Sequence, residues 1–349
     1  MDTSEDATAG MRTTAGVIQM TNGQQYTAPP TGGFPRPECV ESPLRNTTDR
    51  NRADWGAEKG PKGFVRVYRA KYVANARDVV SKLAYVIPKL VDTPRVIISP
   101  PTAREELEER LPAPWNFLVT DIAADALKKL TDQGWWSTPT ITFYVFGPDI
   151  PLPRYIMTLQ NLCTGADHEA CKFVARIVTD KLKSLKEASE FLIKHSAAGD
   201  KDAESALDTI EAKPLEIALP GGESDLVWNI YFTPPKSIDF FRLLEWTSSA
   251  RKLTYDTARH GTGVPRVGRD QLFCIGCKGY DHPTGLCPLP RLVGWFGAPL
   301  QSVSADDKTL SKADERNERN DNKKSKGGKG PRTGGNGHRS GNRNSRRRN

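Results

Sequence analysis

The clearest hydrophobic pattern in the chain is a helical stripe between His168 and His195. Apolar residues recur there every three or four positions, at Val174, Val178, Leu182, Leu185, Ala188 and Leu192. This spacing places the apolar side chains on one face of an α-helix. The same reasoning predicts further helices over 121–133, over 237–253, in the second half of 64–90 and, as a short charged segment, over 103–111.

Alternation with a period of two predicts strands instead. In residues 140–146, the apolar Ile141, Phe143 and Val145 alternate with Thr142 and Tyr144. Short apolar runs bounded by polar or breaker residues predict three more strands, at 115–120, 154–159 and 226–232. We expect the strand at 154–159 to form a hairpin with the one at 140–146.

In chain order these elements predict an α+β fold. The order strand–helix–strand–strand–helix–strand is the split βαβ arrangement, in which two helices cover one face of a four-stranded antiparallel sheet. The run FLVTDI, which begins at Phe117, resembles the first-strand motif of the RNA-recognition motif (RRM). That resemblance implies a ferredoxin-like, RRM-like core at about 115–232, within an α+β domain at 61–253.

The alternative is a ferredoxin-like scaffold whose aromatic side chains all belong to the core. It is favoured by the run RYIMTL at 154–159, which lacks the Gly-aromatic-aromatic pattern with which the RRM family stacks bases. No internal sequence repeat is evident.

The flanking segments lack hydrophobic periodicity. Residues 1–60 are rich in Thr, Gly, Pro and Asn, residues 254–272 are loop-like, and residues 300–349 are polar and charged. The mean hydropathy of −0.55 agrees with a chain that is only partly packed core. We therefore expect a disordered N-terminal segment, a linker at 254–272 and a disordered C-terminal tail.

No apolar run approaches 18 residues, and the N-terminus has no apolar leader. From this we expect no membrane association and an intracellular protein, located in the cytoplasm, the nucleus or both. Six cysteines in a reducing compartment are not expected to form a disulfide framework, and clustered ones indicate a metal site.

Three cysteines and a histidine cluster within 14 residues, in the order Cys274-x2-Cys277-x4-His282-x4-Cys287. Zinc prefers four such ligands in a tetrahedron, and a Cys-x2-Cys turn supplies two of them. With four protein ligands the ion would be structural, because no position remains for a reactive water. The alternatives are an accidental cluster or a redox-active Cys pair.

This spacing resembles the CCHC zinc knuckle of retroviral and retrotransposon nucleocapsid proteins. The resemblance covers residues 274–287 and implies that Cys274, Cys277, His282 and Cys287 bind one zinc ion. Knuckles of that family bind single-stranded RNA or DNA. The sequence departs from the family at Asp281, where glycine is usual, and at Ile275, where an aromatic residue is common.

The resemblance also implies contacts to unpaired bases and phosphates around the metal. The candidates are the apolar, aromatic and basic residues of the knuckle and of its extension to residue 299: Phe273, Ile275, Lys278, Tyr280, Arg291, Trp295 and Phe296. For Trp295 and Phe296 the alternative is packing onto the knuckle or onto the preceding domain. The knuckle and the central domain are expected to have separate sources of stability.

The net charge of +8 is unevenly distributed. Residues 323–349 carry ten Lys and Arg and no Asp or Glu, so the net charge of residues 1–322 is −2. A basic segment of this kind binds phosphates, and its candidate contacts are Lys323, Lys324, Arg346, Arg347 and Arg348. The alternatives are a solubility tail or a nuclear-localisation signal.

These features predict a zinc-dependent protein that binds single-stranded RNA or DNA, with RNA the favoured ligand, and is not an enzyme. No protease triplet, phosphate-binding loop or HExxH motif is present. The knuckle and tail resemble a Gag-like or LINE first-open-reading-frame protein of a retroelement, for example a fungal one, which would coat RNA as a chaperone. The alternatives are a cellular RNA-binding regulator and a self-associating structural protein.

Overall fold

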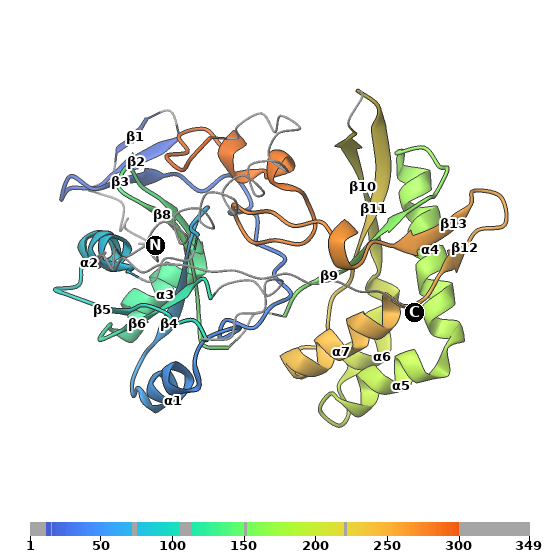
Figure 1. The fold of residues 1–349 in the computed structure, drawn as a ribbon, viewed down its shortest axis with the longest axis horizontal. Helices are drawn as coiled ribbons and strands as arrows, with labels where there is room; N and C mark the ends of the chain where they lie inside the picture. The colour runs from blue at the N-terminus through green and yellow to red at the C-terminus, as the bar shows by residue number, and fades with distance from the viewer. Residues whose placement is uncertain are drawn as a thin grey trace, which may run out of the picture. The chain divides into compact units, whose positions relative to one another are not determined.

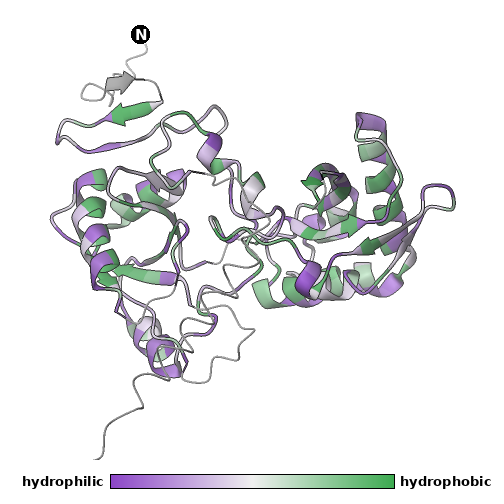
Figure 2. Ribbon diagram, turned by 45° about the horizontal axis from the view of Figure 1, so that its top comes forward, coloured by the Kyte–Doolittle hydropathy of each residue, from purple (hydrophilic) through white to green (hydrophobic). Residues whose placement is uncertain are grey.

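The computed structural model describes residues 12–14, 16–71, 75–104, 114–149, 152–219 and 222–299. Within these residues it has three antiparallel sheets and helices that pack on two of them, so the fold is α+β (Figure 1). Along the longer helices the ribbon alternates between apolar and polar residues (Figure 2), as expected for helices packed on one side. None of these helices has the length and apolarity needed to cross a membrane.

The first sheet is a small meander of β1 (Arg12–Thr14), β2 (Val17–Gln19) and β3 (Gln25–Thr27), followed by helix α1 (Asp49–Ala57). We expected no regular structure in residues 1–60. The described part of this segment is nevertheless folded, because Tyr26 and Trp55 are each only 5% exposed and pack into cores formed by later residues. Local composition cannot reveal such distant partners.

A first α+β unit spans residues 63–146. Its elements are β4 (Gly63–Val67), α2 (Arg77–Val91), β5 (Ile97–Ser99), β6 (Asn116–Thr120), α3 (Ala124–Gln133), β7 (Trp135–Ser137) and β8 (Thr142–Phe146). The strand order is β5-β6-β4-β8-β7. Alternate strand residues such as Val65, Val119 and Phe143 are buried against α2 and α3.

A second α+β unit spans residues 155–265. It contains β9 (Tyr155–Gln160), α4 (His168–Ser184), α5 (Lys186–Lys194), α6 (Lys201–Ser205), η1 (Ala206–Thr209), β10 (Glu211–Ala218), β11 (Ser224–Tyr231), α7 (Phe240–Ala250), β12 (Tyr255–Asp256) and β13 (Thr262–Pro265). The strand order is β10-β11-β9-β13-β12. Its core joins Trp228 and Ile230 of β11 to Val178 of α4 and Leu243 of α7.

The two units share one topology. Each begins strand–helix–strand–strand–helix and ends in two strands. When the strands of each unit are numbered from 1 to 5 in chain order, both sheets have the spatial order 2-3-1-5-4. The element order expected from the sequence therefore occurs twice, once in each unit.

The expected single sheet at 115–232 is wrong. The strands predicted at 115–120 and 140–146 belong to the first unit, whereas those at 154–159 and 226–232 belong to the second. β8 pairs with β4 and β7 and does not form a hairpin with β9. Alternation along a strand reports which residues are buried, but it carries no information about the partner strand.

Two other boundaries differ from the predictions. The expected linker at 254–272 contributes β12 and β13, and β13 pairs with β9. The helix expected over 168–195 is interrupted at Leu185, which has extended backbone angles and separates α4 from α5. The helix expected at 103–111 falls mostly outside the described residues, as does the whole tail at 300–349.

After β13 the chain continues in short 3-10 turns. These are η2 (Gly268–Asp270), η3 (Thr284–Leu286) and η4 (Leu289–Arg291). The Cys/His cluster lies in the segments between these turns.

Candidate metal centre

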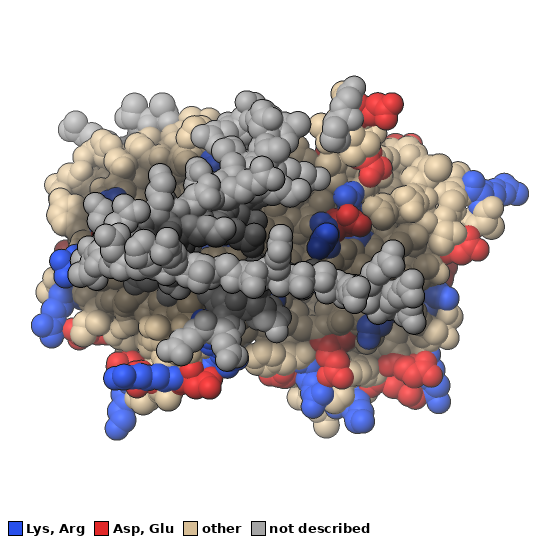
Figure 3. Space-filling view, in the orientation of Figure 1, with Lys and Arg blue, Asp and Glu red and all other residues tan. Residues whose placement is uncertain are grey.

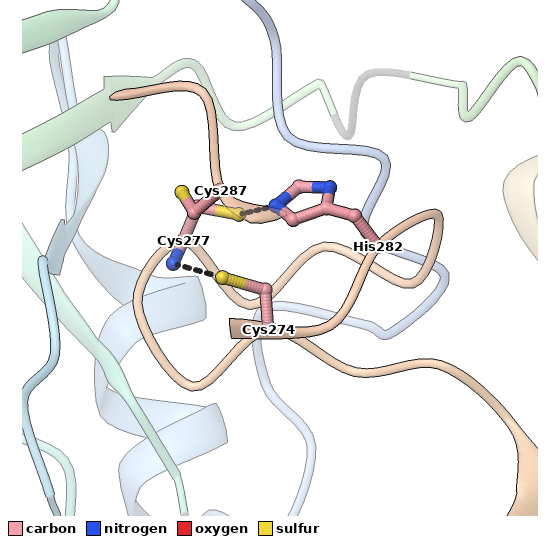
Figure 4. A group of neighbouring side chains, drawn as sticks. All are labelled: Cys274, Cys277, His282 and Cys287. Carbon is pink, nitrogen blue, oxygen red and sulfur yellow. Dashed lines mark hydrogen bonds between the residues drawn. The ribbon is translucent and has the colours of Figure 1, made fainter. Parts of the chain in front are cut away.

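The four expected ligands converge in space. One ligand atom from each of Cys274, Cys277, His282 and Cys287 lies within 4.8 Å of the others. Figure 4 shows the four side chains pointing toward one another from a single looped segment. The cysteines are buried, with exposures of 0%, 2% and 0% in sequence order. The arrangement expected from the spacing is thus confirmed as a cluster that can hold a metal ion.

A tight turn positions the first two cysteines. The backbone N–H of Cys277 donates to Cys274 Sγ at 3.5 Å, and the N–H of Gly279 donates to Cys277 Sγ at 3.3 Å. The turn closes through a bond of 2.9 Å from Cys274 N to the Gly279 carbonyl. A Cβ on Gly279 would lie 3.2 Å from Cys277 Sγ, so glycine suits this position.

The imidazole of His282 has a fixed orientation. Its Nδ1 lies 2.7 Å from Oδ1 of Asp281, while Nε2 lies 3.5 Å from Cys277 Sγ. A carboxylate that accepts from one ring nitrogen directs the other nitrogen toward a metal. Asp281, which departs from the usual knuckle sequence, therefore acts in this structure as the partner of the histidine ligand.

The donor set fits zinc. With Zn–S near 2.3 Å and Zn–N near 2.0–2.1 Å, tetrahedral coordination requires separations of roughly 3.5–3.8 Å between ligand atoms. The observed separation of 3.5 Å between Cys277 Sγ and His282 Nε2 agrees with this requirement. A zinc ion held here would supply cross-linking stability rather than chemistry, because all four positions belong to protein side chains.

The ligand side chains differ in how strongly they hold a proton. Hydrogen bonds from Cys277 and Cys287 hold the pKa of the Cys274 thiol well below its usual range. Burial alone would lower the pKa of His282, but hydrogen bonds with Asp281, Cys274 and Cys287 raise it to about 12. Since metal ligands bind in their deprotonated forms, metal uptake at this site releases protons.

The cluster lies in a hydrophobic core of its own. Tyr68, Trp135 and Leu289 are each at most 7% exposed and pack with the three cysteines. A Cβ on Gly276 would lie 2.6 Å from the ring of Tyr68, and the Gly276 carbonyl accepts from Arg69 N at 3.0 Å. The knuckle is thus packed directly onto the first unit, beyond what the sequence indicated.

The aromatic residues proposed as base contacts mostly pack within the protein. Phe273 stacks on Trp115 at a centroid distance of 5.6 Å and also contacts Tyr280, whose hydroxyl donates to Glu41. Trp295 makes edge contacts with the rings of Tyr68 and Trp135. Phe296 is half-buried, and its backbone N–H donates to Ser137 Oγ at 2.9 Å. For Trp295 this is the packing alternative, whereas for Phe296 only the backbone contact bears on it.

The remaining candidates divide by exposure. Lys278 is 3% exposed, and its ammonium donates to the Ala70 carbonyl at 3.1 Å. Ile275 is 42% exposed, and Arg291 is also exposed. The tail candidates Lys323, Lys324, Arg346, Arg347 and Arg348 lie outside the described residues.

The partners of Asp281 could not be predicted from the sequence. Its backbone carbonyl accepts from Asn229 and its carboxylate accepts from Tyr231, both on β11. An acidic residue beside a histidine ligand was a usable signal, but nothing in the sequence pointed to β11.

Comparison with known proteins provides no relative. No protein-family model, curated protein or solved structure matches this chain. The metal centre and the fold are therefore the basis for a functional assignment.

Proposed function

We propose that this protein is a non-catalytic zinc protein that binds single-stranded nucleic acid, RNA in the first place. The observation that carries the proposal is a CCHC cluster with knuckle spacing, followed in the chain by a segment, 323–349, that has ten Lys and Arg and no acidic residue. Nucleocapsid-type proteins, which the spacing resembles, combine these two features. A retroelement origin and a chaperone role belong to the same proposal.

In this proposal the tail provides most of the affinity. Residues 323–349 carry ten cations, whereas residues 1–322 have a net charge of −2. On the described surface seen in Figure 3, acidic and basic side chains lie interspersed. Lys and Arg that neutralise phosphates release counterions, so this binding would weaken steeply with salt and read little sequence.

The knuckle would contribute a small contact surface. Ile275 and Arg291 are exposed beside the metal cluster, while Phe273, Tyr280 and Lys278 are held by contacts inside the fold. An exposed isoleucine can pack against an unpaired base, and an arginine can pair with a phosphate of the nucleic-acid backbone. The knuckle thereby places a weak base contact on a rigid, metal-held segment.

We further propose that each α+β unit is an RRM-like scaffold. The strand order that the two units share supports a common topology. The scaffold role is supported by the first sheet, whose face away from α2 and α3 is covered. There Phe64, Leu118 and Phe146 pack against Trp55 of α1. A base could not stack on these residues without displacing α1, so the first sheet would serve as a support rather than as a binding platform.

The test is fluorescence anisotropy of a labelled, unstructured RNA at several salt concentrations. The full chain should bind tightly. Deletion of 323–349 should reduce the slope of log K against log salt by about 0.7 for each phosphate that the tail neutralises. The double variant I275A/R291A should weaken binding modestly and reduce the slope by only about 0.7, for the one phosphate that Arg291 neutralises. An unchanged slope in the deletion variant would contradict the proposed role of the tail.

A further inference from the structure

Asp281 joins the metal cluster to the second unit through three hydrogen bonds. Its Oδ1 accepts from His282 Nδ1 at 2.7 Å, and its Oδ2 accepts from the Tyr231 hydroxyl at 3.0 Å. Its backbone carbonyl accepts from Asn229 Nδ2 at 2.6 Å. The side chains of Asp281 and His282 are 19% and 12% exposed, so little water competes for these bonds.

The bonds continue into the sheet. Asn229 Oδ1 accepts from Thr158 Oγ1 at 2.6 Å, and Thr158 Oγ1 lies 2.8 Å from the Tyr155 hydroxyl. Thr158, Tyr155 and Asn229 are at most 5% exposed. A continuous chain of hydrogen bonds therefore runs from a metal ligand, through Asp281 and β11, to β9.

Each polar group in this chain has a defined role. Tyr231 donates, since burial and the charge of Asp281 raise its pKa and keep the hydroxyl protonated. With glycine at position 281, Tyr231 Oη and His282 Nδ1 would both lose their acceptor. Buried polar groups left without partners cost about 1–3 kcal/mol each.

We propose that Asp281 is the positioning residue of the metal centre and the link through which the metal and the second unit stabilise each other. The proposal rests on the zinc site. One carboxylate oxygen orients the imidazole toward the metal, and the other oxygen and the backbone carbonyl attach the loop to β11. By linkage, metal binding stabilises the β11 contact to the same extent that this contact strengthens metal binding.

The test uses the full chain and three variants. D281N keeps the shape of the side chain but removes its charge. Y231F removes the bond from the Tyr231 hydroxyl and keeps the second bond to β11, from Asn229. D270N changes an exposed aspartate of η2 for which the structure shows no side-chain bond, and it serves as the matched control. Zinc affinity is measured by competition with a chelator, and hydrogen exchange of β9 and β11 is measured with and without zinc.

D281N should bind zinc about 10- to 100-fold more weakly than the wild type, as is typical when a metal-bound histidine loses its carboxylate partner. At saturating cobalt, its absorption bands should differ from those of the wild type and D270N, because the imidazole is less firmly oriented. Zinc should slow exchange in β9 and β11 of the wild type and D270N, and much less in D281N and Y231F. Y231F should lose less than tenfold in zinc affinity.

Equal zinc affinity in D281N and the wild type would overturn the positioning role. Equal protection of β11 by zinc in Y231F and the wild type would overturn the Tyr231–Asp281 bond as the link to the second unit. Y231F keeps this second outcome accessible if D281N does not fold. If the wild type itself bound no zinc, the zinc site on which this proposal rests would be refuted. None of these measurements depends on RNA affinity, so they do not test the proposed RNA binding.

Discussion

At the scale of single residues, buried charges around the metal centre balance one another. Three thiolates and a neutral imidazole around a bound Zn²⁺ would carry a net charge of −1. Lys278 is buried beside them, donates to the Ala70 carbonyl, and lies 4.8 Å from the centroid of the Trp115 ring. Its ammonium therefore offsets the charge of the cluster within a low-dielectric core.

Replacing Lys278 by methionine should lower the free energy of unfolding of the zinc-loaded chain by about 1.5–3 kcal/mol, the usual contribution of a hydrogen bond to a charged group. Denaturant unfolding measures this, with K252M at an exposed lysine as the matched control. If Lys278 instead contacted the nucleic acid, the replacement would have the opposite effect. RNA affinity would then fall and stability would stay constant.

Glu41 is a second buried charge, 6% exposed. Burial raises its pKa above the ordinary value of 4.5, although the Tyr280 hydrogen bond and the Arg45 charge oppose the shift. The folded state therefore holds this proton more tightly than the unfolded state, and the stability from Glu41 decreases as pH rises from about 4.5 through the folded pKa.

The variant E41Q removes this titration. The unfolding free energy of the wild type minus that of E41Q should decrease over the same pH window and become constant above it. Parallel denaturant titrations of the two proteins across this range measure the difference. A difference that grows with pH would show that the Arg45 and Tyr280 interactions dominate over burial.

At the scale of elements, the sequence predicts what an element is better than where it packs. The strands at 116–120, 142–146, 155–160 and 224–231 lie close to their predicted positions. Their division between two sheets was missed, because strand pairing depends on partners distant in sequence. The pairing of β4 with β8, for example, joins segments about 80 residues apart.

The extension after the knuckle illustrates such a distant contact. Gly294 has a φ of +76°, and a Cβ there would lie 2.5 Å from the Gly16 carbonyl oxygen. The Gly294 carbonyl also accepts from Thr27 at 2.7 Å. The extension is therefore packed against β2 and β3 at a separation that only glycine permits.

G294A should be markedly more destabilising than G23A. Gly23 has a similar φ of +81° but nothing within 4 Å of the added Cβ, so G23A reports the backbone strain alone, about 1–2 kcal/mol. The clash in G294A should add about 1–3 kcal/mol. Thermal unfolding of both variants measures the difference, and equal melting temperatures would show that the extension does not pack on β2.

At the scale of the whole molecule, the knuckle is part of the folded body. Within residues 12–299 it receives hydrogen bonds from Arg69 of the first unit and from Asn229 and Tyr231 of the second. The four ligands were predictable because their spacing is local. The attachment was not predictable, because it depends on single polar residues of distant strands that have no motif.

H282A, which removes one metal ligand, should therefore affect more than residues 273–299. Faster hydrogen exchange is expected in the knuckle and also around Tyr68, β9 and β11, while the backbone amides of the helices α2 and α4 stay protected. Hydrogen exchange with mass spectrometry measures this in the full chain. Exchange changes confined to 273–299 would instead support the separate stabilities expected from the sequence.

The most direct test of this account is X-ray absorption at the zinc edge of the full-length protein. We predict one zinc per chain with three sulfur ligands at about 2.3 Å and one nitrogen ligand at about 2.0–2.1 Å. Absence of stoichiometric zinc, or a water oxygen among the ligands, would contradict a closed structural site formed by Cys274, Cys277, His282 and Cys287.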